Sequence, residues 1–291
     1  MLCACVDIGT NTTRVLVAEA QDDGIAEVLQ RRAFTCIGKG LKPGADIPRA
    51  KIQEVAAVVA EQVALAEKVG AGQLRVVGTA AIRRAANRDE FVAAVEAACG
   101  REVTILDGYQ EAKLAFLGAT ATLGQDLPGQ VGVVDVGGGS TEIAIGTLAD
   151  GVEWSASVNV GSGFLADHYL HSDPPSVGEL QAVSSHAAGA MEGLGLPAPD
   201  CAVAVGGSAA SVRRLVGAVL EPETLQRALR VLSGTPVAEI ARRFAIDPER
   251  VRLLPAGILI LDAASQKLGK PLQIGKGGLR EGVLLDLART L

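Results

Sequence analysis

The sequence contains few aromatic residues and no long apolar run, and both shortages exclude classes of function. Phe, Trp and Tyr make up 3% of the 291 residues, so the aromatic platforms on which proteins stack single-stranded nucleic acid are scarce. No uninterrupted apolar stretch reaches the ~18 residues that a membrane-spanning helix needs. The first residues show neither a basic segment nor a small-residue cleavage site. We therefore expect no nucleic-acid partner, no membrane span and no secretory signal.

Cysteine and histidine are also sparse, and neither shows the spacing of a metal site. The five cysteines are odd in number and scattered through apolar segments, which favours a reducing, cytoplasmic location. Cys3 and Cys5 could form a metal or redox pair. Inside a strand, however, both would point to one face as small core residues, and we favour this interpretation. The three histidines (His168, His171 and His186) are expected on a solvated helical face.

The charge balance is acidic overall, with a formal net charge of −6. This alone disfavours a polyanionic partner. The C-terminal third is nevertheless basic and could line a groove for a polyphosphate, although solvated helix faces explain pairs such as Arg242 and Arg243 equally well.

The same phosphate-loop pattern occurs twice in the sequence. An apolar strand leads into Asp7 and Gly9 and then into hydroxyl and amide side chains; later another leads into Asp135 and a glycine turn. Glycine lets the backbone approach an anion closely, and successive N–H groups form an anion-binding concavity. An aspartate directly after the strand can hold a divalent cation. The repetition suggests two similar half-domains that clamp one phosphate-rich ligand.

The order of the expected elements repeats as well. Strands over 3–8, 14–19 and 26–35 precede alternating helices and strands, and the series restarts with a strand over 131–136. A loop carrying Arg83 and Arg84 is expected in the first half. This order predicts a duplicated α/β unit with the ligand in a cleft between the halves. The expected domains are 1–118, with a C-terminal helix over 279–291 packing back on it, and 119–278.

Six blocks, in order, resemble the exopolyphosphatase / guanosine pentaphosphate phosphohydrolase (Ppx/GppA) family of the actin–sugar kinase–Hsp70-like superfamily. They are residues 7–11, 78–83, 111–114, 134–142, 254–257 and 278–282. The resemblance implies two ribonuclease H-like (actin-like ATPase) domains with mixed five-stranded sheets flanking a central cleft, in the short, two-domain form. It also implies a Mg²⁺ (or Mn²⁺) cofactor and a homodimer.

The resemblance assigns roles to individual residues. Glu111 stands where the family has its catalytic glutamate; the alternative is an exposed first-turn glutamate that stabilises a helix dipole. Gln110 replaces an acid that the family often has. Asp135, and secondly Asp7, are the expected metal ligands, unless each only caps its own turn. Glu142 could reach the water or the metal, or point elsewhere along its strand.

The remaining expected site residues bind phosphate. Arg83 is expected on the transferred or leaving phosphate, because a guanidinium matches phosphate oxygens bidentately. Arg280 could instead pair with Glu281 or Asp286. The expected phosphate-binding set is Thr10, Asn11, Thr12, Gly137, Gly138, Gly139, Ser140, Thr141, Gly207, Ser208, Lys276 and Arg280.

The interpretation is an exopolyphosphatase that removes the terminal phosphate of inorganic polyphosphate with water. One alternative is hydrolysis of guanosine pentaphosphate to tetraphosphate, which cleaves the same kind of terminal anhydride. Others are a nucleotide-dependent kinase or ATPase of the same superfamily, and a non-catalytic sensor that binds guanosine penta- or tetraphosphate, or polyphosphate.

Overall fold

The computed structural model describes residues 1–21, 24–42, 44–123, 127 and 129–289. These form two compact units, Met1–Gly124 with Gly277–Leu291 (unit 1) and Gln125–Lys276 (unit 2). The boundary predicted after residue 118 falls inside a helix, which continues to Ala121. Among the described residues, no helix combines the length and apolar character that a membrane crossing requires.

Unit 1 is built on a mixed sheet that has five strands within the described residues, in the order β3-β2-β1-β4-β5. The first strand pairs antiparallel with β2 and parallel with β4. The elements of unit 1 are β1 (Leu2–Ile8), β2 (Thr13–Gln21), β3 (Gly24–Ala33), α1 (Arg49–Lys68), β4 (Gln73–Gly78), α2 (Ala80–Arg84), α3 (Arg88–Cys99), β5 (Val103–Ile105), α4 (Gly108–Ala121) and α11 (Leu279–Arg289).

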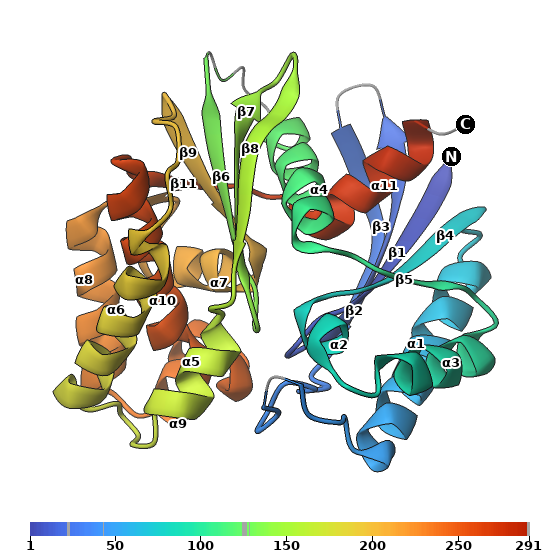
Figure 1. The fold of residues 1–291 in the computed structure, drawn as a ribbon, viewed down its shortest axis with the longest axis horizontal. Coiled ribbons are helices and arrows are strands. Elements are labelled where there is room, and N and C mark those ends of the chain that lie inside the picture. The colour runs from blue at the N-terminus through green and yellow to red at the C-terminus, as the bar shows by residue number, and fades with distance from the viewer. Residues whose placement is uncertain (22–23, 43, 124–126, 128, 290–291) are drawn as a thin grey trace. The chain divides into compact units, whose positions relative to one another are not determined.

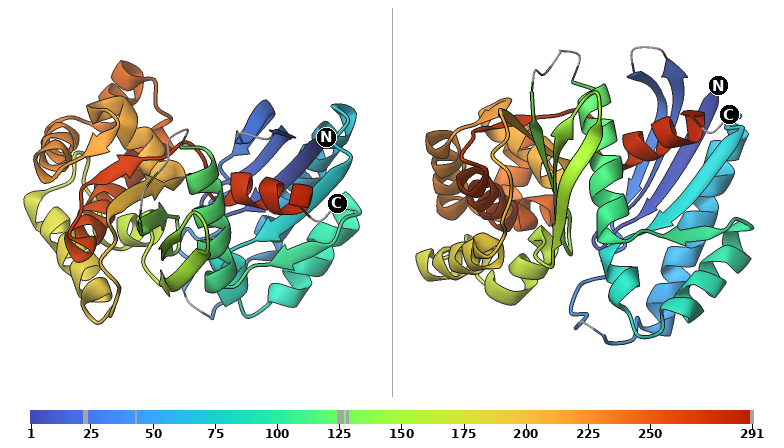
Figure 2. Two further views of the ribbon diagram at one scale, coloured as in Figure 1. Left: turned by 90° about the horizontal axis from the view of Figure 1, so that it is seen from above. Right: turned by 45° about the horizontal axis from the view of Figure 1, so that its top comes forward.

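Both faces of this sheet are covered by helices (Figures 1 and 2). Because side chains alternate along a strand, Val6 and Ile8 join the apolar cluster under α1 and α3. Cys3 and Cys5 point to the opposite face and join the cluster under α4 and α11. The prediction that both cysteines are core residues of one face is confirmed.

Helix α1 forms where the apolar spacing predicts it. Pro48 precedes its first turn, and the helix ends at Lys68. Apolar residues recur every three or four positions along this helix, and all of them are buried, as this spacing predicts; they are Ile52, Val55, Val59, Val63 and Ala66.

Unit 2 repeats the plan with a larger sheet. Its strand order is β10-β11-β9-β6-β7-β8, which gives six strands among the described residues and corrects the predicted five. The additional strand, β10, has only two residues, too few for a periodic pattern. The elements are β6 (Val131–Val136), β7 (Thr141–Thr147), β8 (Gly151–Val158), α5 (Ser162–Tyr169), α6 (Val177–Glu192), β9 (Cys201–Val205), α7 (Gly206–Val216), β10 (Val219–Leu220), α8 (Pro222–Gly234), α9 (Val237–Phe244), α10 (Pro248–Leu268) and β11 (Leu272–Ile274).

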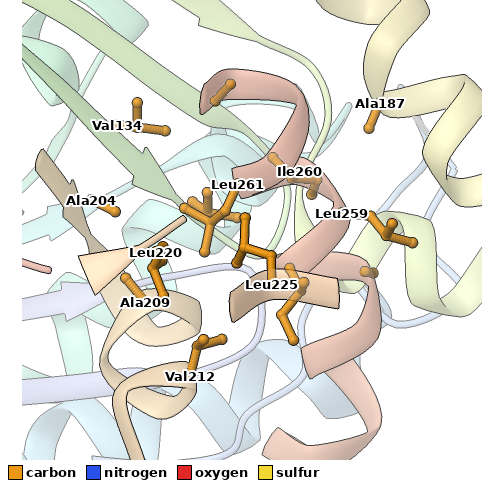
Figure 3. Close-up of a cluster of buried hydrophobic side chains, with 14 of the residues drawn as sticks. Val134, Ala187, Ala204, Ala209, Val212, Leu220, Leu225, Leu259, Ile260 and Leu261 are labelled. Atoms are coloured by element: carbon orange, nitrogen blue, oxygen red, sulfur yellow. The ribbon is translucent and has the colours of Figure 1, made fainter. Parts of the chain in front are cut away.

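The core of unit 2 lies between the sheet and α10. Figure 3 shows Val134 of β6 and Ala204 of β9 facing the same cluster as Leu261 of α10. Side chains of α7 and α8, among them Val212 and Leu225, complete this cluster. Helix α10 is buried along most of its length, which explains its nearly continuous apolar sequence.

The segment with Arg83 and Arg84 is a helix and not the predicted loop. Helix α2 spans Ala80–Arg84 and starts directly after β4, with Thr79 at its N-cap. Its three apolar residues are buried. Five residues make little more than one turn, so no helical repeat marks the segment in the sequence.

Helices α4 and α11 approach closely in unit 1 because each carries a glycine at the crossing. A Cβ on Gly118 of α4 would overlap the backbone of Gly278. A Cβ on Gly282 of α11 would overlap the carbonyl group of Leu114. The backbones therefore touch at a distance that no larger residue permits.

This contact predicts that alanine destabilises the protein at the crossing but not at an open helical glycine. Gly282→Ala should destabilise the protein by about 1–3 kcal/mol, because the overlap is with backbone that cannot rotate away. Gly189→Ala is the matched control: this glycine lies in α6, and a Cβ there would meet nothing within 4 Å. It should stabilise by about 0.5–1 kcal/mol through helix propensity. Urea unfolding at equilibrium measures both, and equal effects would contradict the crossing.

Candidate active site

The two phosphate-loop sequences fold into the same turn. In unit 1 the N–H of Gly9 donates to the carbonyl oxygen of Thr12 at 3.0 Å, and in unit 2 the N–H of Gly137 donates to that of Ser140 at 3.0 Å. A Cβ at either glycine would lie 3.0 Å from the same accepting oxygen. The repeated sequence therefore has a repeated geometry, with glycine required by the close backbone approach.

The polar side chains of the unit 1 loop are buried against the fold. Thr12 Oγ1 accepts a hydrogen bond from Arg14 Nε at 3.1 Å, so the Arg14 side chain lies beside the loop. Thr10 is buried, and Asn11 Nδ2 is a buried donor with no hydrogen-bond partner among the described residues. Because an unsatisfied buried donor is costly, the Asn11 amide is suited to an anion held in the loop.

Asp7 lies at the end of β1, on the sheet face that α4 and α11 cover. It pairs with Arg14 across the β1–β2 ladder, so both side chains share that face. Its Oδ1 atom is buried and has no hydrogen-bond partner in the described structure. Burial raises the pKa of the Asp7 carboxyl, while the positive charges of Arg280 and Arg14 oppose this shift. An orphaned carboxylate oxygen of this kind suits a cation or a ligand proton.

Asp135 occupies the equivalent position in unit 2 but has a different neighbour. It pairs directly with Glu142 across the β6–β7 ladder, so the two carboxylates lie on one face of the sheet. Glu142 is buried and accepts a hydrogen bond from Ser157 Oγ at 2.8 Å. A Cβ on Gly206, at the start of α7, would overlap Asp135 Oδ1, so the carboxylate lies against the helix N-terminus, which favours its negative charge.

Glu111 is buried, which contradicts the alternative of an exposed first-turn glutamate. It lies in the first turn of α4 and is 6% exposed. Arg83 of α2 forms an ion pair with it and also donates to the carbonyl oxygen of Leu106 at 2.6 Å. The structure thus brings together two of the predicted catalytic residues, and it aims the arginine at the glutamate.

Gln110 has a structural role at the same helix end. Its backbone N–H donates to Asp107 Oδ1 at 2.8 Å, and its Oε1 accepts from the Asp107 N–H at 2.9 Å. This reciprocal capping box satisfies two of the free groups at the N-terminus of α4. An acid at position 110 is therefore not needed to start the helix that carries Glu111.

The glycine loop of unit 2 is held by a segment that the sequence analysis did not assign. The N–H groups of Gly163 and Phe164, at the start of α5, donate to the carbonyl oxygen of Gly138 at 3.0 Å. A Cβ on Gly161 would overlap Gly138 and Gly139. The sequence signal was the glycine pair 161 and 163 directly after a strand.

Two further predicted phosphate ligands begin α7. Gly207 and Ser208 lie in its first turn, where free N–H groups point along the helix axis. The Ser208 side chain is buried, and a Cβ on Gly257 of α10 would overlap it. Thr141 is engaged within unit 2, because its hydroxyl donates to the carbonyl oxygen of Val160 at 2.6 Å.

Lys276 is the last residue of unit 2, and Arg280 belongs to unit 1. Lys276 is exposed. Arg280 Nη2 lies 3.8 Å from Glu281 Oε1, and its Nη1 is buried with no hydrogen-bond partner in the described structure. Asp286 pairs with Arg75 at 2.7 Å instead. The positive charge of Arg280 thus acts on Asp7 and opposes the rise of its pKa.

Preformed metal clusters are absent from the described ranges, which contain no group of three or more His, Cys, Asp or Glu side chains that could hold a metal ion. The predicted solvated face fits His168, which is exposed. His186 is only partly exposed, and its Nδ1 lies 2.8 Å from the Tyr169 hydroxyl.

The sequence and the fold of this chain match those of a known protein family. Residues 16–291 match the sequence model described as the Ppx/GppA phosphatase family. Exopolyphosphatase 1 of Mycobacterium leprae is 26% identical over 298 residues, which cover 96% of this chain and 87% of that protein. The guanosine-5'-triphosphate,3'-diphosphate pyrophosphatase of Aeromonas hydrophila is 26% identical over 98% of this chain and 59% of its own length.

A solved structure supports the same family assignment. The crystal structure of the Aquifex aeolicus member of the Ppx/GppA family aligns with a TM-score of 0.82 at 27% identity and covers 100% of this chain and 98% of that one. The predicted α/β, actin-like fold class is confirmed.

Replacing the buried Asp7 carboxylate by a neutral group is expected not to destabilise the protein, whereas most core substitutions do. Because burial raises its pKa, the folded protein holds the Asp7 proton more tightly than the unfolded chain. The protonated Asp7 carboxyl therefore favours the folded state. Its contribution to the free energy of unfolding is complete below the ordinary pKa of 3.8. It is lost as the pH rises through the pKa that Asp7 has in the folded protein. At pH 7 with EDTA, Asp7→Asn should unfold at the same or a higher urea concentration than wild type.

This advantage should shrink as the pH is lowered from 7 towards 4. Asp46→Asn, at an exposed position, should leave stability unchanged at each pH. A marked loss of stability in Asp7→Asn at pH 7 would show that the carboxylate is satisfied by contacts that the amide cannot make.

Proposed function

Because this chain belongs to the Ppx/GppA phosphatase family, we propose that it is an exopolyphosphatase that hydrolyses the terminal phosphoanhydride of inorganic polyphosphate. The observation that carries this proposal is the ion pair between the buried Glu111, in the first turn of α4, and the half-buried Arg83 of α2. A buried carboxylate has a cost unless a cation or hydrogen bonds compensate it. A buried salt bridge contributes little net stability, so its presence here favours a role in catalysis.

Glu111 is the proposed general base. Water is a weak nucleophile, and a carboxylate within hydrogen-bond reach can orient it and accept its proton as it attacks phosphorus. The ion pair with Arg83 fixes the direction of the carboxylate, and the capping box of Asp107 and Gln110 fixes the helix turn on which it stands. The proposed base is thus positioned by groups that all precede it in the sequence.

The phosphate loops supply the electrostatic part of catalysis. Phosphoryl transfer depends mainly on positioning and on neutralising charge around the transferred group. The Asn11 amide and the backbone of Gly137–Thr141 are the proposed donors to phosphate oxygens, together with the first turn of α7. Arg83 is proposed to hold Glu111 and to face the phosphate with the rest of its guanidinium group. Lys276 and Arg280 complete the proposed positive surroundings.

A magnesium ion fits the donor set. Asp135 is the first proposed ligand, because Glu142 lies beside it on the same face, and Asp7 is the second, because its Oδ1 is buried without a partner. Mg²⁺ is usually held by one or two carboxylates with water and substrate phosphates completing its shell, so no larger protein cluster is required. When bound, the cation would neutralise charge on the phosphate oxygens.

Guanosine pentaphosphate is the second candidate substrate. One relative of nearly the same identity is named a guanosine-5'-triphosphate,3'-diphosphate pyrophosphatase, and its substrate presents the same terminal anhydride. None of the residues proposed here to contact phosphate is aromatic, so this set offers no aromatic ring on which guanine could stack. We therefore rank polyphosphate first.

Glu111→Gln should separate chemistry from binding. Loss of the base should lower phosphate release by about 10²–10⁴-fold, while the neutral isostere keeps the helix and leaves polyphosphate affinity within about threefold. Release of orthophosphate from long-chain polyphosphate and from guanosine pentaphosphate, each with Mg²⁺, measures activity. Calorimetric titration with the same ligands measures binding.

Glu61→Gln, at an exposed position of α1, is the matched control and should behave as wild type. Parallel loss of turnover and binding in Glu111→Gln would assign the residue a structural role. Tight binding with no release by wild type itself would identify a sensor, and turnover that requires a nucleotide would identify a kinase or ATPase.

A further inference from the structure

Two helices of unit 2 each end in a pair of exposed arginines. Arg213 and Arg214 lie in the last turn of α7, and Arg242 and Arg243 lie in the last turn of α9. The two ends are joined by a hydrogen bond from Arg214 Nη1 to the carbonyl oxygen of Ala245, at 2.8 Å. All four side chains are exposed. We call these four residues the α7–α9 arginine surface; its helices are labelled in Figure 1.

The ordinary role of a cation at a helix C-terminus explains only part of this surface. Arg214 binds a free carbonyl group, as expected there, and Arg243 covers the Phe244 ring at 5.3 Å. Arg213 and Arg242 form no ion pair and no side-chain hydrogen bond in the part of the chain that the structure describes. Their charge is therefore available to a ligand.

Few acids counter this charge. Glu239 lies one turn before Arg242 and Arg243 in α9 but forms no ion pair with them among the described residues. Asp247 follows α9 and is occupied as the N-cap of α10, where its Oδ1 accepts from the Glu249 N–H at 2.9 Å. The α7–α9 arginine surface is thus a local positive excess on a protein whose formal net charge is −6.

The position of this surface relates it to the proposed phosphate contacts. Helix α7 begins with Gly206, Gly207 and Ser208 and carries Arg213 and Arg214 at its other end. At 1.5 Å per residue, Gly207 and Arg213 are separated by about 9 Å along the helix axis. One helix therefore presents free N–H groups at its start and guanidinium groups at its end, both of which attract phosphate.

We propose that the α7–α9 arginine surface is a second binding site for the body of a long polyphosphate chain. This inference rests on the proposed function, since it assumes that the chain end lies at the phosphate loops. Guanidinium groups bind phosphate oxygens bidentately. Nucleic acid fits less well, because Arg243 covers the neighbouring Phe244 ring, so this ring is not free to stack on a base. A short chain that is held at the phosphate loops leaves fewer phosphate units for this surface than a long chain does.

The test compares binding of long and short chains. In a Glu111→Gln background, which prevents turnover, R213Q/R242Q should raise the Kd for long-chain polyphosphate about tenfold and leave that for tripolyphosphate unchanged. Each lost phosphate contact should also reduce the slope of log Kd against log salt, by roughly 0.7 as measured for single-stranded polyanions. These two arginines are chosen because they have no stabilising partner, so the variant should fold normally.

R31Q/K68Q is the matched control, since it removes the same charge from exposed positions of unit 1 and should leave both Kd values unchanged. An unchanged Kd for long chains in R213Q/R242Q, or an equal loss with tripolyphosphate, would overturn the proposal. Single-stranded DNA that binds wild type as tightly as polyphosphate, and loses affinity in R213Q/R242Q, would also overturn it.

The two proposals fail separately. If wild type releases no phosphate but R213Q/R242Q still weakens long-chain binding, the arginine surface stands without the hydrolase. If wild type hydrolyses polyphosphate and the variant binds long chains normally, the hydrolase stands without the surface.

Discussion

The close crossing of α4 and α11 is the constraint on which the site in unit 1 depends. Backbone contact at Gly118 and Gly282 sets the position of α4, whose first turn carries Glu111, and of α11, whose first turn carries Arg280. Both helices cover the sheet face on which Asp7 lies. Glu111 and Arg280, from distant parts of the sequence, are therefore held over the sheet face of Asp7 by one helix contact. This couples the packing of the core directly to the proposed chemistry.

The two units share a turn but differ in the charges around it. In unit 1 the loop aspartate, Asp7, is opposite Arg14 and near Arg280, whereas in unit 2 Asp135 is opposite Glu142. Paired carboxylates attract a hard cation, while arginines attract phosphate. The charges therefore favour a cation at the unit 2 loop and phosphate at the unit 1 loop. This physical difference is the reason for ranking Asp135 above Asp7 as a metal ligand.

Much of the fold could be predicted because its signals are local and periodic. The strand before each loop, the buried stripe of α1 and the restart of the pattern at Val131 follow from apolar spacing alone. Short elements gave no such signal, so α2 was expected to be a loop and β10 was missed. Site contacts depend on tertiary structure: no sequence rule shows that Arg83 turns to Glu111. The cap of α4 is different, because the spacing of Asp107 and Gln110 fits a capping box that the sequence analysis did not use. The partner of Arg280 was equally undetermined, because Glu281 and Asp286 were both considered, and only the structure shows that Asp286 pairs with Arg75.

The central claim is that water attacks the terminal phosphorus of polyphosphate at a site organised by Glu111. It is tested most directly by incubating the protein with Mg²⁺ and long-chain polyphosphate in ¹⁸O-labelled water and analysing the released orthophosphate by mass spectrometry. The account predicts orthophosphate that carries one solvent oxygen, formed while the remaining chains shorten from their ends. Phosphate that appears only on an added nucleotide, or no orthophosphate at all, would contradict it.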